Sequence, residues 1–158
     1  MTYEIATQLF EYKNDILYWR KDTKNTYKGK PVSPSLKRKY LQVKHKNKLY
    51  YIHRIVFLLC NGYLPKYIDH INQNKHDNRI ENLRECNYFQ NMANTKGWKN
   101  RTLPKGVSKN GNNFNARIMY MGKQYNLGTF KSIEEAENIY INKSKELLKE
   151  FSPYYSFA

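Results

Sequence analysis

The segment Tyr67-Ile-Asp69-His70-Ile71 is followed by a polar loop, and after that loop come Asn82-Leu83-Arg84-Glu-Cys86 and Asn87-Tyr-Phe-Gln90-Asn91. The two short stretches on either side of the loop have the length of β-strands. Asn87 is a good helix N-cap, and Gln90 stands at the third helical position, which predicts a capping box. The segment therefore predicts a strand, a loop, a second strand and a helix, in that order.

The chemistry of this segment is that of a hard metal site beside a base. Asp69 and Asn91 can each offer an oxygen to one ion, which suits Mg²⁺ because this ion keeps waters and takes further ligands from phosphate. His70 has a side chain that can accept a proton near neutral pH. In an ideal strand Asp69 and His70 face opposite sides, so both reach one site only if the strand ends, twists or bulges there. A turn-rich loop with a surface histidine is the alternative that the pattern alone leaves open.

At this level of detail the segment resembles the HNH endonucleases, most closely the phage and group I intron homing type with a ββα-metal (His-Me finger) core. The resemblance implies that Asp69 binds the metal, that His70 is the general base and that Asn91 completes the metal site. It also implies that Asn82, twelve residues after His70, braces the loop. The residues that carry the resemblance are His53-Arg54, Asp69-His70-Ile71-Asn72, Asp77-Asn78-Arg79-Ile80-Glu81-Asn82-Leu83-Arg84 and Gln90-Asn91.

The chain before this segment reads as strands and turns over residues 1–51, followed by a helix. Residues 10–12 and 16–19 flank Asn14-Asp15, and residues 40–44 and 48–52 flank His45-Lys-Asn47, so two hairpins are predicted. Residues 53–61 have a helical apolar face that ends at Asn61-Gly62. Because the resemblance to the HNH endonucleases also extends over these elements, it implies an HNH endonuclease domain over residues 1–94.

A polar, basic linker is predicted over residues 95–104, and a second domain over residues 105–158. Three short strand candidates, at residues 106–108, 115–119 and 124–127, are separated by Asn110-Gly111 and Met121-Gly122. Ser132 then opens a helix with a capping box to Glu135. The predicted fold class is α+β: an HNH core with N-terminal β hairpins, followed by a three-stranded sheet and one helix. The side of that helix expected to be apolar carries Ile133, Ala136, Ile139, Tyr140, Leu147, Leu148 and Phe151.

This second unit resembles an AP2 domain, a family whose three-stranded sheet lies in the DNA major groove. The resemblance starts at Lys105-Gly106-Val107 and ends in the predicted helix; Lys105 replaces the usual Arg, and Phe114 the usual Trp. Because Lys offers a point charge where Arg can bind guanine through two hydrogen bonds, the sequence supports DNA binding more firmly than base specificity. The residues that the resemblance implies for DNA contact are Lys105, Lys109, Arg117, Lys123 and Tyr125.

Composition and charge agree with a nucleic-acid partner. The 158 residues include 28 Lys and Arg against 13 Asp and Glu, a net charge of +15, which favours binding to a polyanion. The heavily used residues Lys, Asn, Ile and Tyr have AT-rich codons, so an AT-rich genome is an alternative source of part of this charge. No apolar run is long enough to span a bilayer, and the first residues lack a secretory signal, so no membrane partner is expected. Two cysteines without a CxxC pair exclude a four-cysteine zinc ribbon and favour a reduced, cytoplasmic chain.

Several further residues have two interpretations each. Arg54 and Arg84 are candidates for DNA contact, and an ion pair on the surface is the alternative for each. His53 is expected to pack beneath the site, with phosphate contact as the alternative. Trp19 and Trp98 are expected to pack in the interior, His76 to be solvated, and Cys60 to be buried as a small apolar residue.

The sequence thus predicts an endonuclease that hydrolyses phosphodiester bonds of double-stranded DNA, with Mg²⁺ or another hard divalent ion such as Mn²⁺ as cofactor. A phage-encoded enzyme in the cytoplasm of a bacterial host, acting as a monomer or a weak homodimer, fits this prediction. A monomer has one site and is expected to nick one strand. The alternatives are a DNA-binding regulator with a relic HNH core, and a ribonuclease acting on structured RNA.

Overall fold

The fold was analysed in a computed structural model that describes residues 1–22, 28–34, 36–94 and 102–155. Its contacts divide the chain into two compact units, Met1–Cys86 and Asn87–Ala158, and each unit is treated separately below. This division groups residues 87–94 with the C-terminal unit, whereas the sequence predicts them with the HNH domain, so that domain boundary stays a prediction. Trp98 and most of the predicted linker lie outside the described residues.

The N-terminal unit opens with a helix that the sequence analysis missed. Helix α1 (Tyr3–Leu9) starts after Thr2, whose hydroxyl oxygen accepts a hydrogen bond from the Ile5 amide at 3.4 Å. Ala6 and Leu9 are buried. Seven residues make about two helical turns, so this segment shows too little periodicity to be told apart from the strands that follow it. The prediction that residues 1–51 hold only strands and turns was wrong here.

Two antiparallel hairpins follow, as predicted. Strand β1 (Phe10–Lys13) pairs with β2 (Ile16–Trp19), and β3 (Gln42–His45) pairs with β4 (Lys48–Tyr51). The two residues of each turn, Asn14-Asp15 and Lys46-Asn47, all have positive φ angles between 46° and 62°. Two-residue turns of this kind match the twist of the strands that they join. The second turn is one residue shorter than predicted, because His45 belongs to β3.

Helix α2 (Ile52–Asn61) ends where the sequence predicts, at Gly62, which adopts the left-handed conformation with φ 77°. Its buried residues include Ile55 and Val56, which pack into the core formed with α1 and both hairpins. Trp19 is buried in this core against Phe10, at 4.7 Å between ring centroids, which confirms its predicted packing role. Cys60 is exposed, so the prediction of a buried Cys60 was wrong.

The segment that decides the site has the predicted order. Strand β5 (Tyr67–His70) pairs antiparallel with β6 (Leu83–Cys86), a short 3-10 helix η1 (Ile80–Asn82) directly precedes β6, and α3 (Tyr88–Ala93) follows it. The capping box of α3 is complete. Asn87 Oδ1 accepts from the Gln90 amide at 2.9 Å, and Gln90 Oε1 accepts from the Asn87 amide at 2.8 Å.

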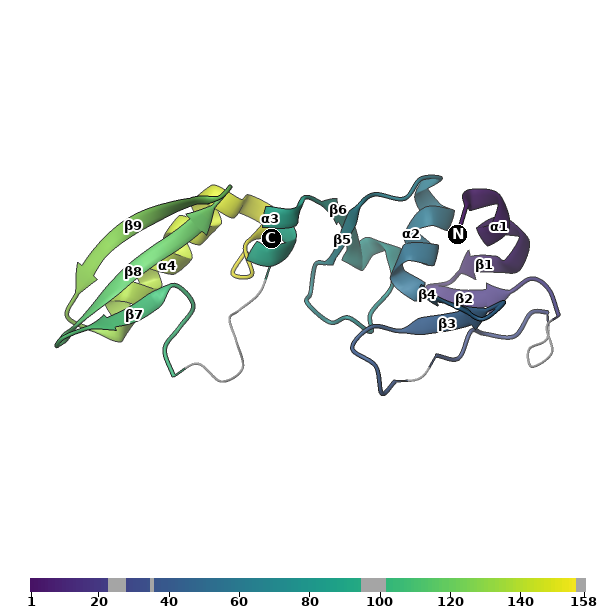
Figure 1. Cartoon of the computed structure of the whole chain (residues 1–158), viewed down its shortest axis with the longest axis horizontal. Coiled ribbons are helices and arrows are strands. Elements are labelled where there is room, and N and C mark those ends of the chain that lie inside the picture. The colour runs from purple at the N-terminus through teal and green to yellow at the C-terminus, as the bar shows by residue number, and fades with distance from the viewer. Residues whose placement is uncertain (23–27, 35, 95–101, 156–158) are drawn as a thin grey trace. The chain divides into compact units, whose positions relative to one another are not determined.

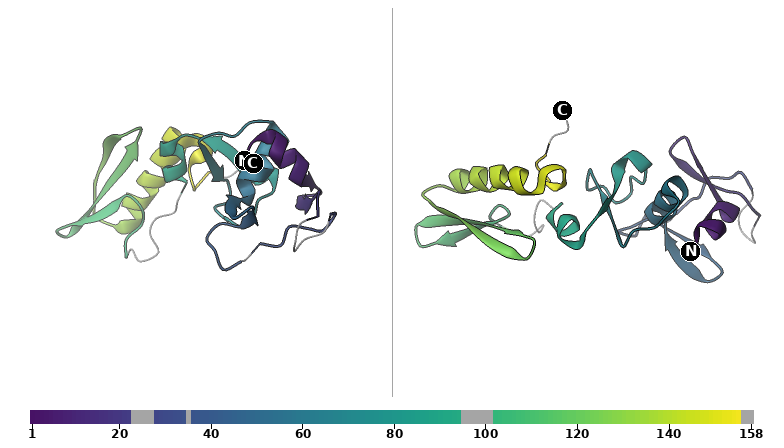
Figure 2. Two further views of the ribbon diagram at one scale, coloured as in Figure 1. Left: turned by 45° about the vertical axis from the view of Figure 1, so that its right-hand side comes forward. Right: turned by 90° about the horizontal axis from the view of Figure 1, so that it is seen from above.

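The C-terminal unit is a three-stranded antiparallel sheet with one helix against it, as Figure 1 and the view from above in Figure 2 show. Its strands lie in the order β7 (Val107–Asn110), β8 (Asn113–Tyr120) and β9 (Lys123–Phe130), and α4 (Ile133–Leu148) is followed by the 3-10 helix η2 (Lys149–Phe151). These elements confirm a mixed α+β architecture. In the ranges that the structure describes, no helix is long and apolar enough to cross a membrane.

The core of this unit lies between α4 and one face of the sheet, where Ala136 packs with Val107 and Ala116. Ser132 Oγ accepts from the Glu135 amide at 3.1 Å, which confirms the predicted N-cap. Gly106 has φ 80°, and a Cβ atom there would collide with the ring of Tyr140. Close approach of strand and helix thus requires glycine at this position. Ile139 is 39% exposed, so its predicted place on the apolar side was wrong.

Candidate active site

Asp69 and His70 are consecutive residues of β5, but their side chains lie on opposite faces of the sheet. Asp69 is paired with Arg84 across the ladder, and His70 is paired with Leu83. Residues directly opposite each other share a face of the sheet, and successive residues alternate between faces. Asp69 therefore faces Arg84, whereas His70 shares its face with Leu83. Strand β5 ends at His70, which is one of the conditions under which both side chains can serve one site.

His70 is buried, and its ring is held by an amide side chain from the following loop. His70 Nε2 lies 3.0 Å from Asn78 Oδ1. The amide nitrogen of Asn78 donates to the His76 carbonyl at 3.5 Å, which turns the amide oxygen toward the imidazole. An amide oxygen only accepts, so this orientation places a proton on Nε2 and leaves the lone pair on Nδ1. Asn78 therefore selects the tautomer of His70.

The electrostatic surroundings favour the neutral form of His70. Burial lowers the pKa of His70, and the hydrogen bond to Asn78 and the negative charge of Asp69 oppose that shift only in part. A neutral imidazole is the form that can take a proton from a water molecule. His70 is thus in the protonation state that a general base requires at neutral pH.

A second histidine packs directly against His70. The His53 ring lies edge-on to the His70 ring, with 5.1 Å between centroids, and it contacts Tyr40 and Tyr51 at 5.5 Å each. Burial, together with the charges of His70 and Arg54, lowers the pKa of His53 to about 3. Among the described residues no partner hydrogen-bonds to its buried Nδ1. His53 is therefore a neutral part of the wall beneath His70, which is the structural role predicted for it.

Asn82 fastens both ends of the loop between β5 and β6. Its Oδ1 accepts from the Asn72 amide at 2.9 Å, and its Nδ2 donates to the Asp77 carbonyl at 2.7 Å. Its side chain is buried, so these two bonds are shielded from water and costly to lose. This geometry is that of a brace, the role that the resemblance implies for Asn82.

The outer part of the same loop is held by charged groups. Asp77 accepts from Arg79 Nε at 2.9 Å and from Asn72 Nδ2 at 2.8 Å, and these hydrogen bonds lower the pKa of Asp77 to about 2. The Tyr12 hydroxyl accepts from the Ile80 amide at 3.0 Å and ties the loop to β1. His76 is exposed as predicted, and its Nε2 lies 2.8 Å from the Arg38 carbonyl. The backbone that carries Asn78 is therefore fixed from several sides.

Two arginines predicted to touch DNA have partners within the protein. Arg84 Nε and Nη2 both donate to Asp69 Oδ2, at 3.0 and 2.8 Å, and the two side chains are only 13% and 7% exposed. This contact is an ion pair, as one of the two interpretations expected, but it is buried. Arg54 Nη2 donates to the Pro65 carbonyl at 3.1 Å and so holds the segment between α2 and β5. DNA contact by either arginine stays a prediction.

The predicted metal ligands fit a hard divalent ion in their chemistry. Asp69 offers a carboxylate and Asn91, in α3, offers a carboxamide oxygen. These residues fall in different compact units, and each is described within its own unit. Within the described ranges no group of three or more His, Cys, Asp or Glu side chains could hold a metal ion.

The predicted DNA contacts of the C-terminal unit do not share one face of the sheet. Strand register places Arg117 opposite Asn126, on the face away from α4, but places Tyr125 opposite the buried Ile118. Lys109 and Lys123 are exposed and share a side with Tyr125 by the same register. Lys105 Nζ donates to the Ala93 carbonyl at 2.9 Å, and burial lowers the pKa of Lys105 to about 8. Arg117 alone among these five lies on the open face.

Comparisons with known proteins match the segment that contains these residues. Residues 50–93, which run from β4 through α3, match the family model described as HNH endonuclease. An uncharacterized HNH endonuclease of Acanthamoeba polyphaga mimivirus is 33% identical over 105 residues, which are 64% of this chain and 54% of that relative. The chain thus spans about half the length of this curated relative. No solved structure matches the chain. Both matches point to a nuclease, and neither extends support to an AP2-like C-terminal domain.

Two features of the site were not found by sequence reasoning. Asn78 belongs to the quoted motif, but the sequence analysis gave it no role. In an irregular loop, unlike a helix or a strand, residue spacing does not show in which direction a side chain points. The ion pair of Arg84 with Asp69 follows from strand register, and register is set here by a twelve-residue connection that the sequence alone does not fix.

Proposed function

We propose that this protein is a metal-dependent endonuclease that hydrolyses phosphodiester bonds of double-stranded DNA. The observation that carries the proposal is His70, a buried neutral imidazole whose tautomer is set by Asn78, within a segment that matches the HNH endonuclease family. The net charge of +15 supports a polyanionic substrate. The viral source of the relative supports a phage or viral origin.

In this proposal His70 Nδ1 takes a proton from a water molecule, and the oxygen of that water attacks the phosphorus. The bond to the 3′ oxygen breaks, and the 3′ oxygen takes a proton from a second water molecule, which leaves a 5′ phosphate and a 3′ hydroxyl. Asn78 keeps the proton of His70 on Nε2, so that the lone pair stays on Nδ1. Asn82 keeps the loop that carries Asn78 in place.

Asp69 and Asn91 are the residues proposed to hold the divalent ion, Mg²⁺ or Mn²⁺. Such an ion, when bound, supplies positive charge to the leaving 3′ oxygen and to the phosphate. The chain contributes one carboxylate and one carboxamide, and the buried position of Asp69 makes a cation beside it necessary at all times.

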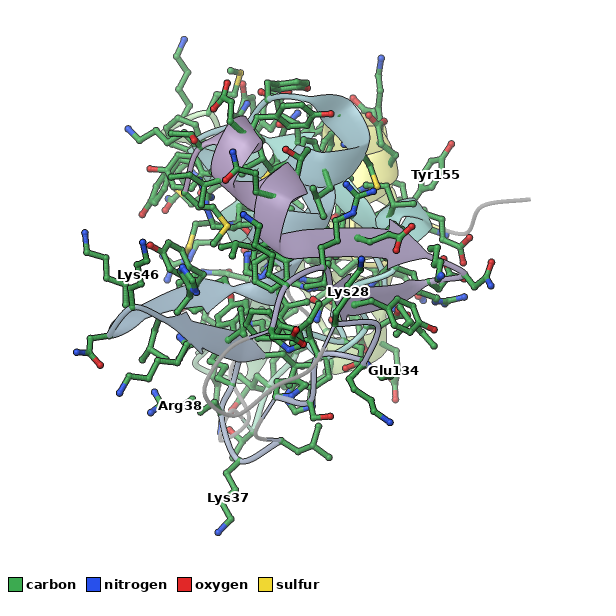
Figure 3. All side chains as sticks on the ribbon, turned by 90° about the vertical axis from the view of Figure 1, so that its right-hand side faces the viewer. Lys28, Lys37, Arg38, Lys46, Glu134 and Tyr155 are labelled. Atoms are coloured by element: carbon green, nitrogen blue, oxygen red, sulfur yellow. The ribbon has the colours of Figure 1, made fainter. Side chains whose placement is uncertain are left out.

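Exposed cations supply the proposed contacts with the DNA backbone. Lys37, Arg38 and Lys46 project into solvent from the N-terminal unit, as Figure 3 shows. In the C-terminal unit, Arg117 on the open sheet face is the best-placed candidate for a base contact. We propose that this unit binds DNA through its sheet, as the AP2 resemblance implies. This binding is expected to weaken with salt, because phosphate contacts release counterions.

Plasmid nicking tests the nuclease proposal. Wild-type protein with Mg²⁺ or Mn²⁺ is expected to convert supercoiled plasmid to open circles, and EDTA or His70→Ala should abolish the conversion. His76→Ala, which replaces an exposed histidine of the same loop, is the matched control and should keep activity. Genomic DNA of the natural host, cut in parallel, covers a target site that the plasmid lacks.

The two alternatives make different predictions in the same assay. A regulator with a relic core would bind both DNAs and cut neither with any divalent metal. A ribonuclease would cut structured RNA and leave duplex DNA intact. The presence of Asp69, His70, Asn82 and Asn91 together favours the nuclease over a relic, because a relic is expected to have lost at least one of them.

A further inference from the structure

The buried ion pair between Arg84 and Asp69 occupies a carboxylate that the proposed function needs for a metal ion. Both contacts of Arg84 end on the same oxygen, Asp69 Oδ2, and both side chains are almost withdrawn from water. Hydrogen bonds between charged groups at 2.8–3.0 Å in such surroundings are strong. In the protein without DNA, the charge of Asp69 is therefore already balanced by an internal cation.

An arginine in this position opposes a divalent cation at the same carboxylate. A metal on Asp69 would stand a few ångströms from the guanidinium, and like charges at that range repel strongly where water is scarce. The arginine cannot relieve the repulsion by losing its proton, because a guanidinium stays charged at all relevant pH values. Metal binding to Asp69 alone is therefore expected to be weak for as long as Arg84 has no other anion to bind.

A DNA phosphate is an anion that Arg84 can bind in place of Asp69. A phosphate, although tetrahedral, offers the guanidinium two oxygens that can accept a pair of hydrogen bonds, as the two oxygens of a carboxylate can. Arg84 is the second residue of β6 and lies opposite Asp69 in the ladder, so we expect a phosphate beside a metal on Asp69 to come within reach of Arg84. With the phosphate present, the two positive groups, Arg84 and the metal, are balanced by the two negative groups, Asp69 and the phosphate.

We propose that Arg84 couples metal binding to DNA binding. Without DNA, Arg84 binds Asp69 and keeps the affinity for metal low; with DNA, Arg84 transfers hydrogen bonds to a phosphate and Asp69 becomes a ligand for the metal. The inference rests on the proposed function, since it takes Asp69 as the metal ligand. Its consequence is that the complete site assembles only on substrate.

Direct Mn²⁺ binding tests this coupling without depending on cleavage. Free Mn²⁺ is measured by electron paramagnetic resonance during titration of the full-length His70→Ala protein, alone and with a short DNA duplex that it binds. The same titration of an Asp69→Asn, His70→Ala protein, with and without duplex, gives the background of metal bound elsewhere and on DNA. Subtraction leaves the Mn²⁺ bound through Asp69.

The expected result is an increase of at least about tenfold in this Asp69-dependent affinity when DNA is added, from the repulsion that is relieved. Arg84→Gln should raise the affinity without DNA by a similar factor and shrink the effect of DNA. Arg84→Lys, which keeps the charge, should remain close to the wild-type residue. Arg20→Gln removes the same charge from an exposed site at the end of β2 and should change neither value.

Two outcomes overturn the inference, and they are distinguishable. If Asp69-dependent binding is present but equal with and without DNA, the coupling fails while the proposed nuclease stands. If no Mn²⁺ binding depends on Asp69 under either condition and the wild type does not nick plasmid, the proposed function fails and the coupling with it. The comparison with and without DNA needs no Arg84 variant, so it remains decisive even if Arg84→Gln does not fold.

Discussion

Lowering the pH should destabilise the N-terminal unit through His53. The structure lowers the pKa of this side chain to about 3, while an unfolded histidine has a pKa of about 6.5. Between these two pKa values His53 is protonated in the unfolded state and neutral in the folded state. The stability that comes from neutral His53 is thus fully present above pH 6.5 and is lost as the pH falls toward 3.

The size of this effect follows from the two pKa values. Below pH 6 each pH unit removes about 1.4 kcal/mol from the free energy of unfolding for one such group, and the change from pH 7 to pH 5 amounts to about 2 kcal/mol. His70 shifts in the same direction and adds to the wild-type slope. Asp77, whose pKa is about 2, acts in more acidic solution, so the range from pH 7 to 5 isolates the histidines.

Urea unfolding of the wild type and of His53→Phe at pH 7 and pH 5 measures the effect. Fluorescence of Trp19, which is buried in the core of this unit, reports unfolding in a Trp98→Phe background. The loss of stability between the two pH values should be smaller in His53→Phe by about 2 kcal/mol. His76→Ala, in contrast, should behave like the wild type. An equal pH dependence in the wild type and His53→Phe would refute the neutral, buried His53 described above.

Three further predictions concern the loop and the C-terminal unit. Asn78→Leu should reduce the nicking rate about tenfold or more, because His70 loses the partner that fixes its tautomer. The imidazole nitrogen chemical shifts of the variant should show both tautomers of His70. An unchanged nitrogen spectrum would contradict this role of Asn78. Asn82→Ala leaves the Asn72 amide and the Asp77 carbonyl without their partner and should cost about 1–3 kcal/mol in urea unfolding, whereas Asn74→Ala, at an exposed position of the same loop, serves as the control. Gly106→Ala places a methyl group against Tyr140 at a left-handed backbone position and should cost more than about 1 kcal/mol, whereas Gly111→Ala has the open space that makes it a control for backbone strain alone.

The elements that could be predicted from the sequence are those with strong local signals. The first hairpin follows from Asn14-Asp15, a pair that accepts positive φ angles, the second from the strand patterns on either side of residues 45–47, and α2 from its apolar face and from Gly62. Helix α1 has no comparable signal. Cys60 and Ile139 were misplaced for a related reason: helical period places a residue on a face, but the extent of the neighbouring core decides whether that position is covered. Cys60 lies in the last turn of α2 and is exposed.

The site itself was only half visible in the sequence. The resemblance to the HNH endonucleases implies that Asn82 braces the loop, and in the structure Asn82 makes two hydrogen bonds within the loop that follows His70. The residues that contact Asp69 and His70 could not be predicted from the sequence. Their residue types are common in this chain, and only the folded geometry shows which of them make these contacts. Asn78 is one of many asparagines, and Arg84 is one of 28 Lys and Arg residues. Strand register and loop conformation select these two from the rest.

The carboxylate of Asp69 needs a cationic partner inside the protein even though the chain as a whole is strongly cationic. A surface rich in Lys and Arg attracts phosphate from a distance, but Asp69 is buried, and exposed cations screened by water do little for a desolvated charge. The carboxylate therefore requires a cation in direct contact. Arg84, on the neighbouring strand, meets this requirement, and its guanidinium can pair with phosphate oxygens as well as with a carboxylate, which is the property that the proposed coupling uses. The residue that stabilises the buried carboxylate is thus chemically suited to the response to substrate that we propose.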